Sequence, residues 1–253
     1  MPYPAHVSDA AYCYDGSYAG FLCCIFESYT RCEIPSAVLG PAEGQTTLFG
    51  TEAIATDPTH ARRVANGLTR LGPMVRERVM TGFLSTEEEK DLILLRFARR
   101  CFDEGPRAVQ MLGDPDVHAA FVLERNVNNE VCRFIEFIRF EEKDGMLGSV
   151  IHPKNNVLPL LRGHFCSRLP DEDFLIFDAA HGTALLRQSG HVQYLAMEHY
   201  EPARDADELN WQALWKRFFH ALTIEERRNA KAQMNHAPKR FWGGMVEMRE
   251  PYI

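Results

Sequence analysis

The amino-acid sequence predicts an α+β fold. The first half is expected to be helical, the second half to form an antiparallel sheet of about five strands, and the C-terminal helices to pack on that sheet. Helix-start signals recur in the first half, among them two Asp-Pro pairs that begin at Asp57 and Asp114. After residue 134 the chain changes to short β-branched and aromatic runs separated by turn dipeptides, a pattern typical of strands.

The first half is predicted to contain four long helices and a few short strands. Ser17 can cap a helix with its hydroxyl, and Ser85 with Glu88 forms a capping box. Residues 1–11 are expected to be a loose leader. The strands are expected over residues 11–14, 46–49 and 53–56, and the helices over residues 17–32, 57–71, 85–103 and 114–133.

The second half reads as two strands, a helix and three strands. The turn at residues 143–145 joins the first two strands, and Gly182 and Gly190 mark the turns between the last three. This order favours an antiparallel sheet with helices on one face. The helix is expected to start at Asn155 or Asn156, and the strands are expected over residues 134–140, 146–151, 174–178, 183–187 and 192–198.

One α+β domain is expected over residues 12–253. It would comprise a helical subdomain at about 12–133, a sheet subdomain at about 134–200 and a C-terminal helical segment at about 201–253. Within the last segment, Leu214, Phe218 and Leu222 recur at a spacing of four residues, which is the apolar stripe of an amphipathic helix. We therefore expect this helix to pack on the sheet.

The composition is that of an ordinary globular protein, with 45% hydrophobic and 25% charged residues. The formal net charge of −7 is unlike that of a protein that coats nucleic acid with its whole surface. The charge is unevenly placed, however. Residues 1–59 hold seven carboxylates against Arg31, whereas residues 216–240 hold seven lysines and arginines against two glutamates. A phosphate would bind at this local basic stretch.

The cysteines and motifs exclude several classes of protein. Seven cysteines, an odd number without any C-x-x-C pair, argue against a disulfide framework. No C-x-x-x-C-x-x-C run is present, so the chain is not itself a radical-SAM enzyme. Motifs for nucleotide hydrolysis, dinucleotide binding and serine hydrolysis are missing, and no cofactor is predicted. Without a signal peptide or an apolar run of about 18 residues, the chain is expected to be cytoplasmic and to make no membrane contact.

The most distinctive stretch is residues 223–242. Thr223 followed by Glu226 is a capping box, so a helix should begin there and end before Pro238. After the proline, two cations precede two aromatic residues, and such groups can bind phosphate and stack on a base. The alternative is that the aromatic residues close a hydrophobic core. The candidate nucleic-acid-binding residues are Arg227, Asn229, Gln233, Lys239, Arg240, Phe241 and Trp242.

The same stretch, ERRNAKAQMNHAPKRFW, resembles the C-terminal signature of a poorly characterised bacterial family assigned to DNA metabolism. In that signature an arginine and an asparagine precede a glutamine and then P-x-R-[FY]-W. The runs YDGSYAGFL, RFIEFIRF, HPKNNVLPLLRGHF and FLIFD resemble other parts of the family, so the resemblance spans residues 12 to about 247. It implies a role beside a radical-SAM DNA modification or repair protein, usually encoded by a neighbouring gene. It also implies that the domain can be fused to a uracil-DNA-glycosylase-like domain, but it supplies no catalytic residue.

Asp178, Asp15 and His164 are weaker candidates for catalysis. Asp178 ends the apolar run FLIF and could activate water, although an ion pair with an arginine is the competing interpretation. Asp15 precedes Gly16 at a predicted strand–helix junction, where a simple turn is the competing interpretation. No metal site is predicted, because the histidines and the aspartate of the predicted sheet region match no named metal motif. These residues are His152, His164, Asp178 and His181.

Three functions remain open from the sequence. The leading hypothesis is a DNA-binding accessory protein in repair or modification that acts with a radical-SAM partner. Its cations would contact phosphate, and Phe241 or Trp242 would stack on an unpaired base. The second hypothesis is a base-removing or strand-processing enzyme that uses Asp178 or Asp15 with a histidine. The third is a protein-interaction module that makes no contact with DNA.

Overall fold

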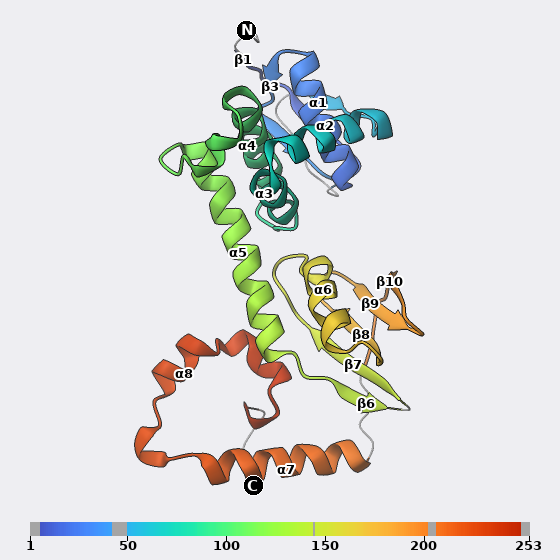
Figure 1. Ribbon diagram of the computed structural model, residues 1–253, viewed down its shortest axis with the longest axis vertical. Helices are drawn as coiled ribbons and strands as arrows, with labels where there is room; N and C mark the ends of the chain where they lie inside the picture. The colour runs from blue at the N-terminus through green and yellow to red at the C-terminus, as the bar shows by residue number, and fades with distance from the viewer. Residues whose placement is uncertain (1–5, 42–49, 144, 202–205, 249–253) are drawn as a thin grey trace. The chain divides into compact units, whose positions relative to one another are not determined.

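The computed structural model describes residues 6–41, 50–143, 145–201 and 206–248 (Figure 1). The fold is α+β, with a mainly helical first half and a five-stranded sheet in the second half. The chain divides into two compact units, Met1–Asn128 and Asn129–Ile253. The single domain expected over residues 12–253 stays a prediction.

The first unit contains a small parallel sheet in which β2 pairs with both β4 and β5. A second parallel pair joins β1 to β3, so residues 6–7 of the expected leader form a strand, while residues 1–5 lie outside the described ranges. The strand expected at residues 46–49 also lies outside them. The strands are β1 (His6–Val7), β2 (Ala11–Cys13), β3 (Glu33–Ile34), β4 (Ala37–Leu39) and β5 (Thr51–Ala53).

Helices make up most of the first unit. Ser17 and Asp57 cap α1 and α2 as predicted, because the Ser17 hydroxyl accepts from the Gly20 amide at 2.9 Å and the Asp57 carboxylate accepts from the Thr59 amide at 2.6 Å. The helices are α1 (Tyr18–Thr30), α2 (Pro58–Leu71), α3 (Pro73–Phe83), α4 (Lys90–Glu104), the 3₁₀ helix η1 (Pro106–Gln110) and α5 (Pro115–Phe137), of which residues 129–137 belong to the second unit.

The capping box predicted at Ser85 does not open a helix. The Ser85 amide donates to the Gly82 carbonyl at 3.0 Å, so Ser85 completes the end of α3, and α4 begins only at Lys90. The spacing of a hydroxyl and a glutamate suits both a helix start and a tight turn after a preceding helix. The preceding helix decides between them here.

The core of the first unit is apolar but includes two buried arginines. Phe21, Leu95 and Phe97 are fully buried within it. Arg78 forms a 2.7 Å ion pair with Glu124, and Arg99 donates to the Ser28 carbonyl at 2.7 Å. Because each guanidinium has partners inside the unit, burying these charges is tolerated.

The sheet of the second unit is mixed, not antiparallel as predicted. Its strand order is β10-β9-β8-β7-β6, and β7 runs parallel to β8 while the other neighbours are antiparallel. The cause is the helix α6 (Leu158–Arg168), since a strand–helix–strand crossover returns the chain in the same direction. The strands are β6 (Glu141–Lys143), β7 (Met146–Ile151), β8 (Asp173–Asp178), β9 (Thr183–Gln188) and β10 (His191–Ala196).

The strand predicted at residues 134–140 is also corrected. α5 continues through Phe137, and β6 starts only at Glu141. Val127, Val131 and Phe134 lie three and four residues apart and are all buried, so the helical period continues through this aromatic run. β-Branched and aromatic residues favour strands only weakly, and burial on a helix face overrides that preference here.

Both faces of the sheet carry apolar side chains. In Figure 1 α6 lies over the sheet, and Phe140 links the two because its ring lies 5.4 Å from Phe165 of α6 and 6.1 Å from Phe174 of β8. On the other side Phe177 contacts Tyr200, with ring centroids 6.5 Å apart. The sheet is therefore covered by apolar side chains on both faces.

The apolar face of α7 (Ala206–Leu222) does not pack on the sheet as predicted. Leu214, Phe218 and Leu222 of α7 are each more than half exposed, and α7 instead packs against η4, where Trp215 Nε1 donates to Glu247 at 2.8 Å. In none of the described ranges is a helix long and apolar enough to cross a membrane. The C-terminal elements are α7 (Ala206–Leu222), the 3₁₀ helices η2 (Glu225–Arg227), η3 (Lys239–Gly244) and η4 (Val246–Met248), and α8 (Ala230–His236).

Candidate nucleic-acid interface and the adjoining pocket

The helix predicted from Thr223 begins later, at Ala230. The Thr223 hydroxyl donates to the Phe219 carbonyl at 2.7 Å and so completes the end of α7. Asn229 is the N-cap of α8, where its side-chain oxygen accepts from the Ala232 amide at 3.0 Å. Asn229 therefore lies at the start of α8 and not within a helix that begins at Thr223. The chain leaves α8 before Pro238 as predicted.

Five lysine and arginine side chains are exposed from the end of η2 to the start of η3. Arg227, Arg228, Lys231 and Lys239 are exposed, and the Arg240 side chain keeps 54% of its surface accessible. Glu226 is exposed among them. This segment, residues 227–240, is called the basic segment below. Its charge contrasts with the net charge of −7 of the whole chain.

Arg240 also connects the basic segment to a buried carboxylate. Its Nη1 atom lies 3.2 Å from Oε1 of Glu130, a residue of α5 that is only 2% exposed at the side chain. The same carboxylate accepts the Lys154 amide at 3.0 Å, and the Asn155 amide and side chain at 2.8 and 2.7 Å. Glu130 thus joins the start of η3 to the loop between β7 and α6.

Sequence reasoning missed Glu130. It is one of several glutamates on α5, and no local motif distinguishes it. Its one distinguishing feature is its position beside the buried Val127–Val131–Phe134 stripe. A charged side chain buried there is stable only if partners in ion pairs or hydrogen bonds compensate its charge. Those partners lie more than twenty residues away in the sequence, so spacing could not identify them.

The two aromatic candidates lie in different environments. Phe241 is 5% exposed and packs against Phe134 and Phe137, with ring centroids 5.0 and 5.9 Å away. Trp242 is half-buried, and its Nε1 donates to the Ala237 carbonyl at 2.7 Å. Phe241 therefore anchors η3 in the core, and Trp242 keeps part of its surface accessible.

The remaining nucleic-acid candidates are set into the local structure. Gln233 Nε2 lies 3.4 Å from the Met248 sulfur, which ties α8 to η4. The Lys239 ammonium lies 5.8 Å from the centre of the Trp242 ring, a cation–π distance. The structure thus brings Lys239, Arg240 and Trp242 together on η3 and places Arg227 earlier, at the end of η2.

The catalytic candidate Asp178 is paired with a histidine. Its carboxylate is buried at the end of β8, accepts the Ala180 and His181 amides at 3.0 and 3.1 Å, and lies 2.7 Å from Nδ1 of His181. Such a pair favours the tautomer with the proton on Nδ1 and leaves Nε2 as an acceptor. The arrangement also closes the turn between β8 and β9.

Asp15 and His164 lie in less suggestive places. Asp15 is exposed in the first unit and accepts from the Ser17 amide, the Ser17 hydroxyl and Thr56. The hydrogen bonds from Ser17, followed by that from Thr56, hold the pKa of the Asp15 carboxyl below its usual range. His164 lies on α6, with its ring 4.9 Å from that of Phe165. Across the described ranges, no group of three or more histidine, cysteine or acidic side chains is placed to hold a metal ion.

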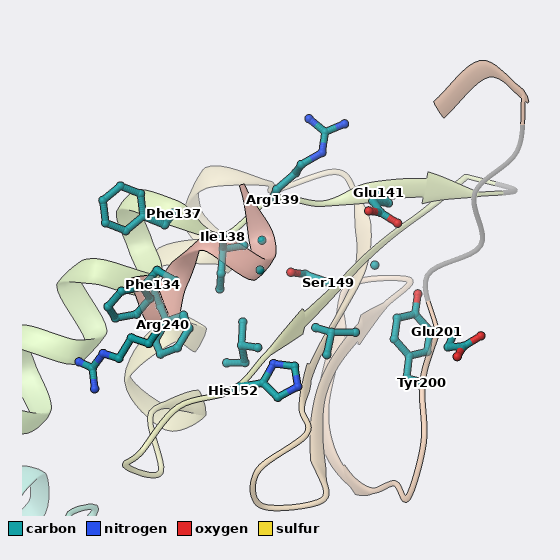
Figure 2. A pocket seen from close by; sticks show the side chains of 16 residues that line it. Phe134, Phe137, Ile138, Arg139, Glu141, Ser149, His152, Tyr200, Glu201 and Arg240 are labelled. Atoms are coloured by element: carbon teal, nitrogen blue, oxygen red, sulfur yellow. The ribbon is translucent and has the colours of Figure 1, made fainter. Parts of the chain in front are cut away.

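A pocket of about 260 Å³ adjoins η3 in the second unit (Figure 2). Phe134, Phe137 and Phe241 form its apolar wall, and β7 forms the opposite side. Ser149 and His152 contribute polar groups between them, while Arg240 lies at the edge beside Phe134. Sequence reasoning did not predict this pocket, because its walls come from α5, β7 and η3.

Tyr200 and glycines shape the remainder of the pocket. A Cβ atom at residue 148 would overlap the Tyr200 hydroxyl, so only glycine lets this ring lie against β7. Burial, followed by the nearby Glu141 charge, raises the pKa of Tyr200, which therefore stays a neutral hydrogen-bonding group at physiological pH. Figure 2 shows the Arg139 guanidinium turned away from the pocket, and this group forms an ion pair with Glu208 at 2.5 Å.

A model of a family described as a domain of unknown function, DUF4130, matches residues 88–247. No curated protein and no solved structure matches the chain. The matched residues include Glu130, the pocket-lining strand β7 and the whole basic segment. Because the match covers more than half of the sequence, the chain belongs to the DUF4130 family.

Proposed function

We propose that the protein is a DNA-binding accessory protein of DNA repair or modification, and that its basic segment contacts the phosphate backbone. The observation that carries this proposal is the row of five exposed cations in an acidic chain. Cations contact phosphate without reading the base sequence, and this contact supplies most non-specific affinity. The resemblance of the C-terminal signature to DNA metabolism proteins supports the same role, which implies a cytoplasmic protein.

The residues have different proposed roles. Arg227, Lys239 and Arg240 would contact phosphate, and the accessible part of Trp242 would stack on a base. The sequence alone predicts that Asn229 and Gln233 contact base edges or sugar. In the structure Asn229 caps α8 and Gln233 contacts Met248, so both would also support the segment that carries the cations. Phe241 would anchor the same segment through its core contacts.

The test is binding of labelled single- and double-stranded DNA, measured by fluorescence anisotropy at several salt concentrations. We expect the Arg227→Ala, Lys239→Ala double variant to lower the slope of log affinity against log salt by about 0.7 to 0.9 for each phosphate that the protein no longer neutralises. The matched control is Arg168→Ala, which removes an exposed arginine from α6 in the same unit. An unchanged slope in a folded double variant would reject the basic segment as the DNA contact.

We also propose a protein partner, a radical-SAM DNA repair or modification protein. The sequence resemblance supports the identity of this partner, and the exposed apolar residues of α7 support the presence of a protein interface. The same resemblance supports a functional link to uracil-DNA-glycosylase-like domains. Co-expression and co-purification with the radical-SAM protein test the proposal. A Leu214→Asp, Phe218→Asp variant should lose the complex, and its retention would exclude α7 as the interface.

A second candidate function is catalysis of base removal or strand processing. The 2.7 Å contact between Asp178 and His181 favours it, because a carboxylate that orients an imidazole is a common arrangement for a general base. Incubating the protein with oligonucleotides that contain damaged bases tests this function. Asp178→Asn should abolish turnover while leaving binding intact, whereas turnover retained by this variant would exclude Asp178.

A further inference from the structure

The pocket beside η3 lies at an open edge of β7. The pairing of β6 with β7 stops at Glu141 and Gly148, although β7 continues to Ile151. The Ile151 carbonyl accepts from the Ala179 amide, so the backbone groups of Ile151 point toward β8. Because backbone groups alternate along a strand, those of Val150 point the opposite way, toward the place that β6 would occupy. Val150 therefore presents one donor and one acceptor on the pocket side.

The walls around this edge are suited to a flat ring. Phe134, Phe137 and Phe241 supply aromatic surface, while Ser149 and His152 add side-chain donors and acceptors beside the Val150 backbone. The volume of about 260 Å³ lies just below the range of about 300 to 1,000 Å³ for drug-sized ligands. A single heterocycle with hydrogen-bonding groups on one edge matches both the size and the lining.

The charge at the pocket edge indicates what the ring is attached to. Arg240 lines the pocket, and its side chain is 54% exposed with its Nη1 atom held by Glu130. Lys239, the preceding residue, is exposed as well. A guanidinium in a fixed position beside an aromatic pocket suits a phosphate linked to the bound ring. An added peptide strand fits less well, because only residues 149–151 form the open edge.

We propose that this pocket receives one unpaired nucleobase, whose edge faces Val150, Ser149 and His152 and whose phosphate lies at Arg240. The proposal rests on the proposed DNA binding and adds a ligand and a site to it. Binding of this kind requires a base that is already unpaired or is turned out of the stack. It also explains why an exposed phosphate-binding group is held against the rim of an aromatic pocket.

Glycine residues allow a sharp test. Nothing lies within 4 Å of a Cβ atom built at Gly243, which lines the pocket, or at Gly163, which lies on α6 outside it. Gly243→Leu should therefore add a large apolar side chain to the pocket lining without a clash at the Cβ atom, and Gly163→Leu is the matched control. Thermal melts of both variants establish that they are folded.

The probe is a short strand of abasic residues that carries one central adenine or thymine, compared with the same strand without any base. Wild type and Gly163→Leu should bind the strand with a base about tenfold more tightly, the effect expected from stacking one base. Gly243→Leu should bind both strands equally, because the phosphate contacts remain. A second measurement, ligand-detected NMR with free nucleosides, should show saturation of wild type and none of Gly243→Leu.

The outcomes separate this proposal from the proposed function. If wild type binds both strands equally, or if folded Gly243→Leu keeps the preference for the base, the pocket proposal fails while DNA binding stands. If wild type binds no strand but binds nucleosides in a way that Gly243→Leu loses, the pocket takes a free nucleoside and the DNA-binding function fails. If wild type binds neither strands nor nucleosides, both proposals fail.

Discussion

Two amphipathic helices, α4 and α7, show how differently the same sequence pattern is used in the two units. Both repeat large apolar residues three and four positions apart. Leu94, Leu95 and Phe97 of α4 are fully buried in the first unit, whereas Leu214 and Phe218 of α7 are more than half exposed in the second. The periodicity therefore identifies an apolar face without showing what covers it. Substitutions in the buried face of α4 should destabilise the fold more than the same substitutions in the exposed face of α7.

The largest effect is expected in α4. Phe97→Ala removes a fully buried ring that also lies under the Arg78 guanidinium at 5.5 Å. The reduced burial and the cavity should lower the free energy of unfolding by about 3 to 5 kcal/mol. Chemical denaturation monitored by circular dichroism measures this change. A decrease in the free energy of unfolding of less than about 1 kcal/mol would mean that Phe97 is not buried as the structure shows.

A smaller effect is expected where one carboxylate anchors the C-terminal segment. Glu130→Gln replaces an acceptor oxygen with an NH₂ donor that faces the Asn155 amide or Arg240. Because two donors then face each other, the free energy of unfolding should fall by about 1 to 3 kcal/mol. Hydrogen exchange should rise at residues 153–156 and 239–244 more than elsewhere in the second unit. Glu136→Gln is the control, because Glu136 lies on the same helix and forms an exposed ion pair with Arg133. If the two variants change the free energy of unfolding and the hydrogen exchange equally, Glu130 does not anchor the C-terminal segment.

The helix starts show which parts of the fold could be predicted from sequence. Asp57 before Pro58 has few alternatives, since proline fixes the first turn and the carboxylate accepts the next amides, and α2 begins there. Thr223 and Ser85 have the same capping chemistry, but the Thr223 hydroxyl donates back to the end of α7, whereas the Ser85 hydroxyl accepts from the Glu87 amide in the turn before α4. A hydroxyl can serve either side of a junction, so the surrounding structure decides its role.

The candidate site was predictable only where it depends on local chemistry. The cations of the basic segment could be named from sequence because charge favours exposure, and all five are exposed. The burial of Phe241 against Phe134, the position of Glu130 and the open edge at Val150 depend on residues far apart in the chain. The strand–helix–strand order was predicted correctly, but it does not show that β7 and β8 are neighbours in the sheet, and only that adjacency makes the α6 crossover a parallel pair.

A pH-dependent effect is expected at the start of α1. The pKa of Asp15 is held below its unfolded value by hydrogen bonds from Ser17 and Thr56, so its contribution to stability is present at neutral pH. That contribution disappears as the pH falls through the folded-state pKa and the carboxylate becomes protonated. Asp15→Ala should therefore lower Tm at pH 7 and lower it less in acid. The control Asp9→Asn changes an exposed carboxylate in the same unit and should leave Tm unchanged at both pH values. A Tm difference independent of pH would contradict the assignment.

The smallest effect is expected in α7. Phe218→Ala is the same change as Phe97→Ala, but the ring is 55% exposed, so the free energy of unfolding should change by less than about 0.5 kcal/mol. Denaturation of the two variants under identical conditions provides the comparison. A cost above about 2 kcal/mol at Phe218 would show that the α7 face is covered in solution, and the contrast between α4 and α7 would disappear. If Phe218→Ala instead changes the free energy of unfolding little but no longer co-purifies with the radical-SAM protein, the exposed face of α7 is assigned to binding. The Phe218 side chain would then contribute to the complex and not to the fold.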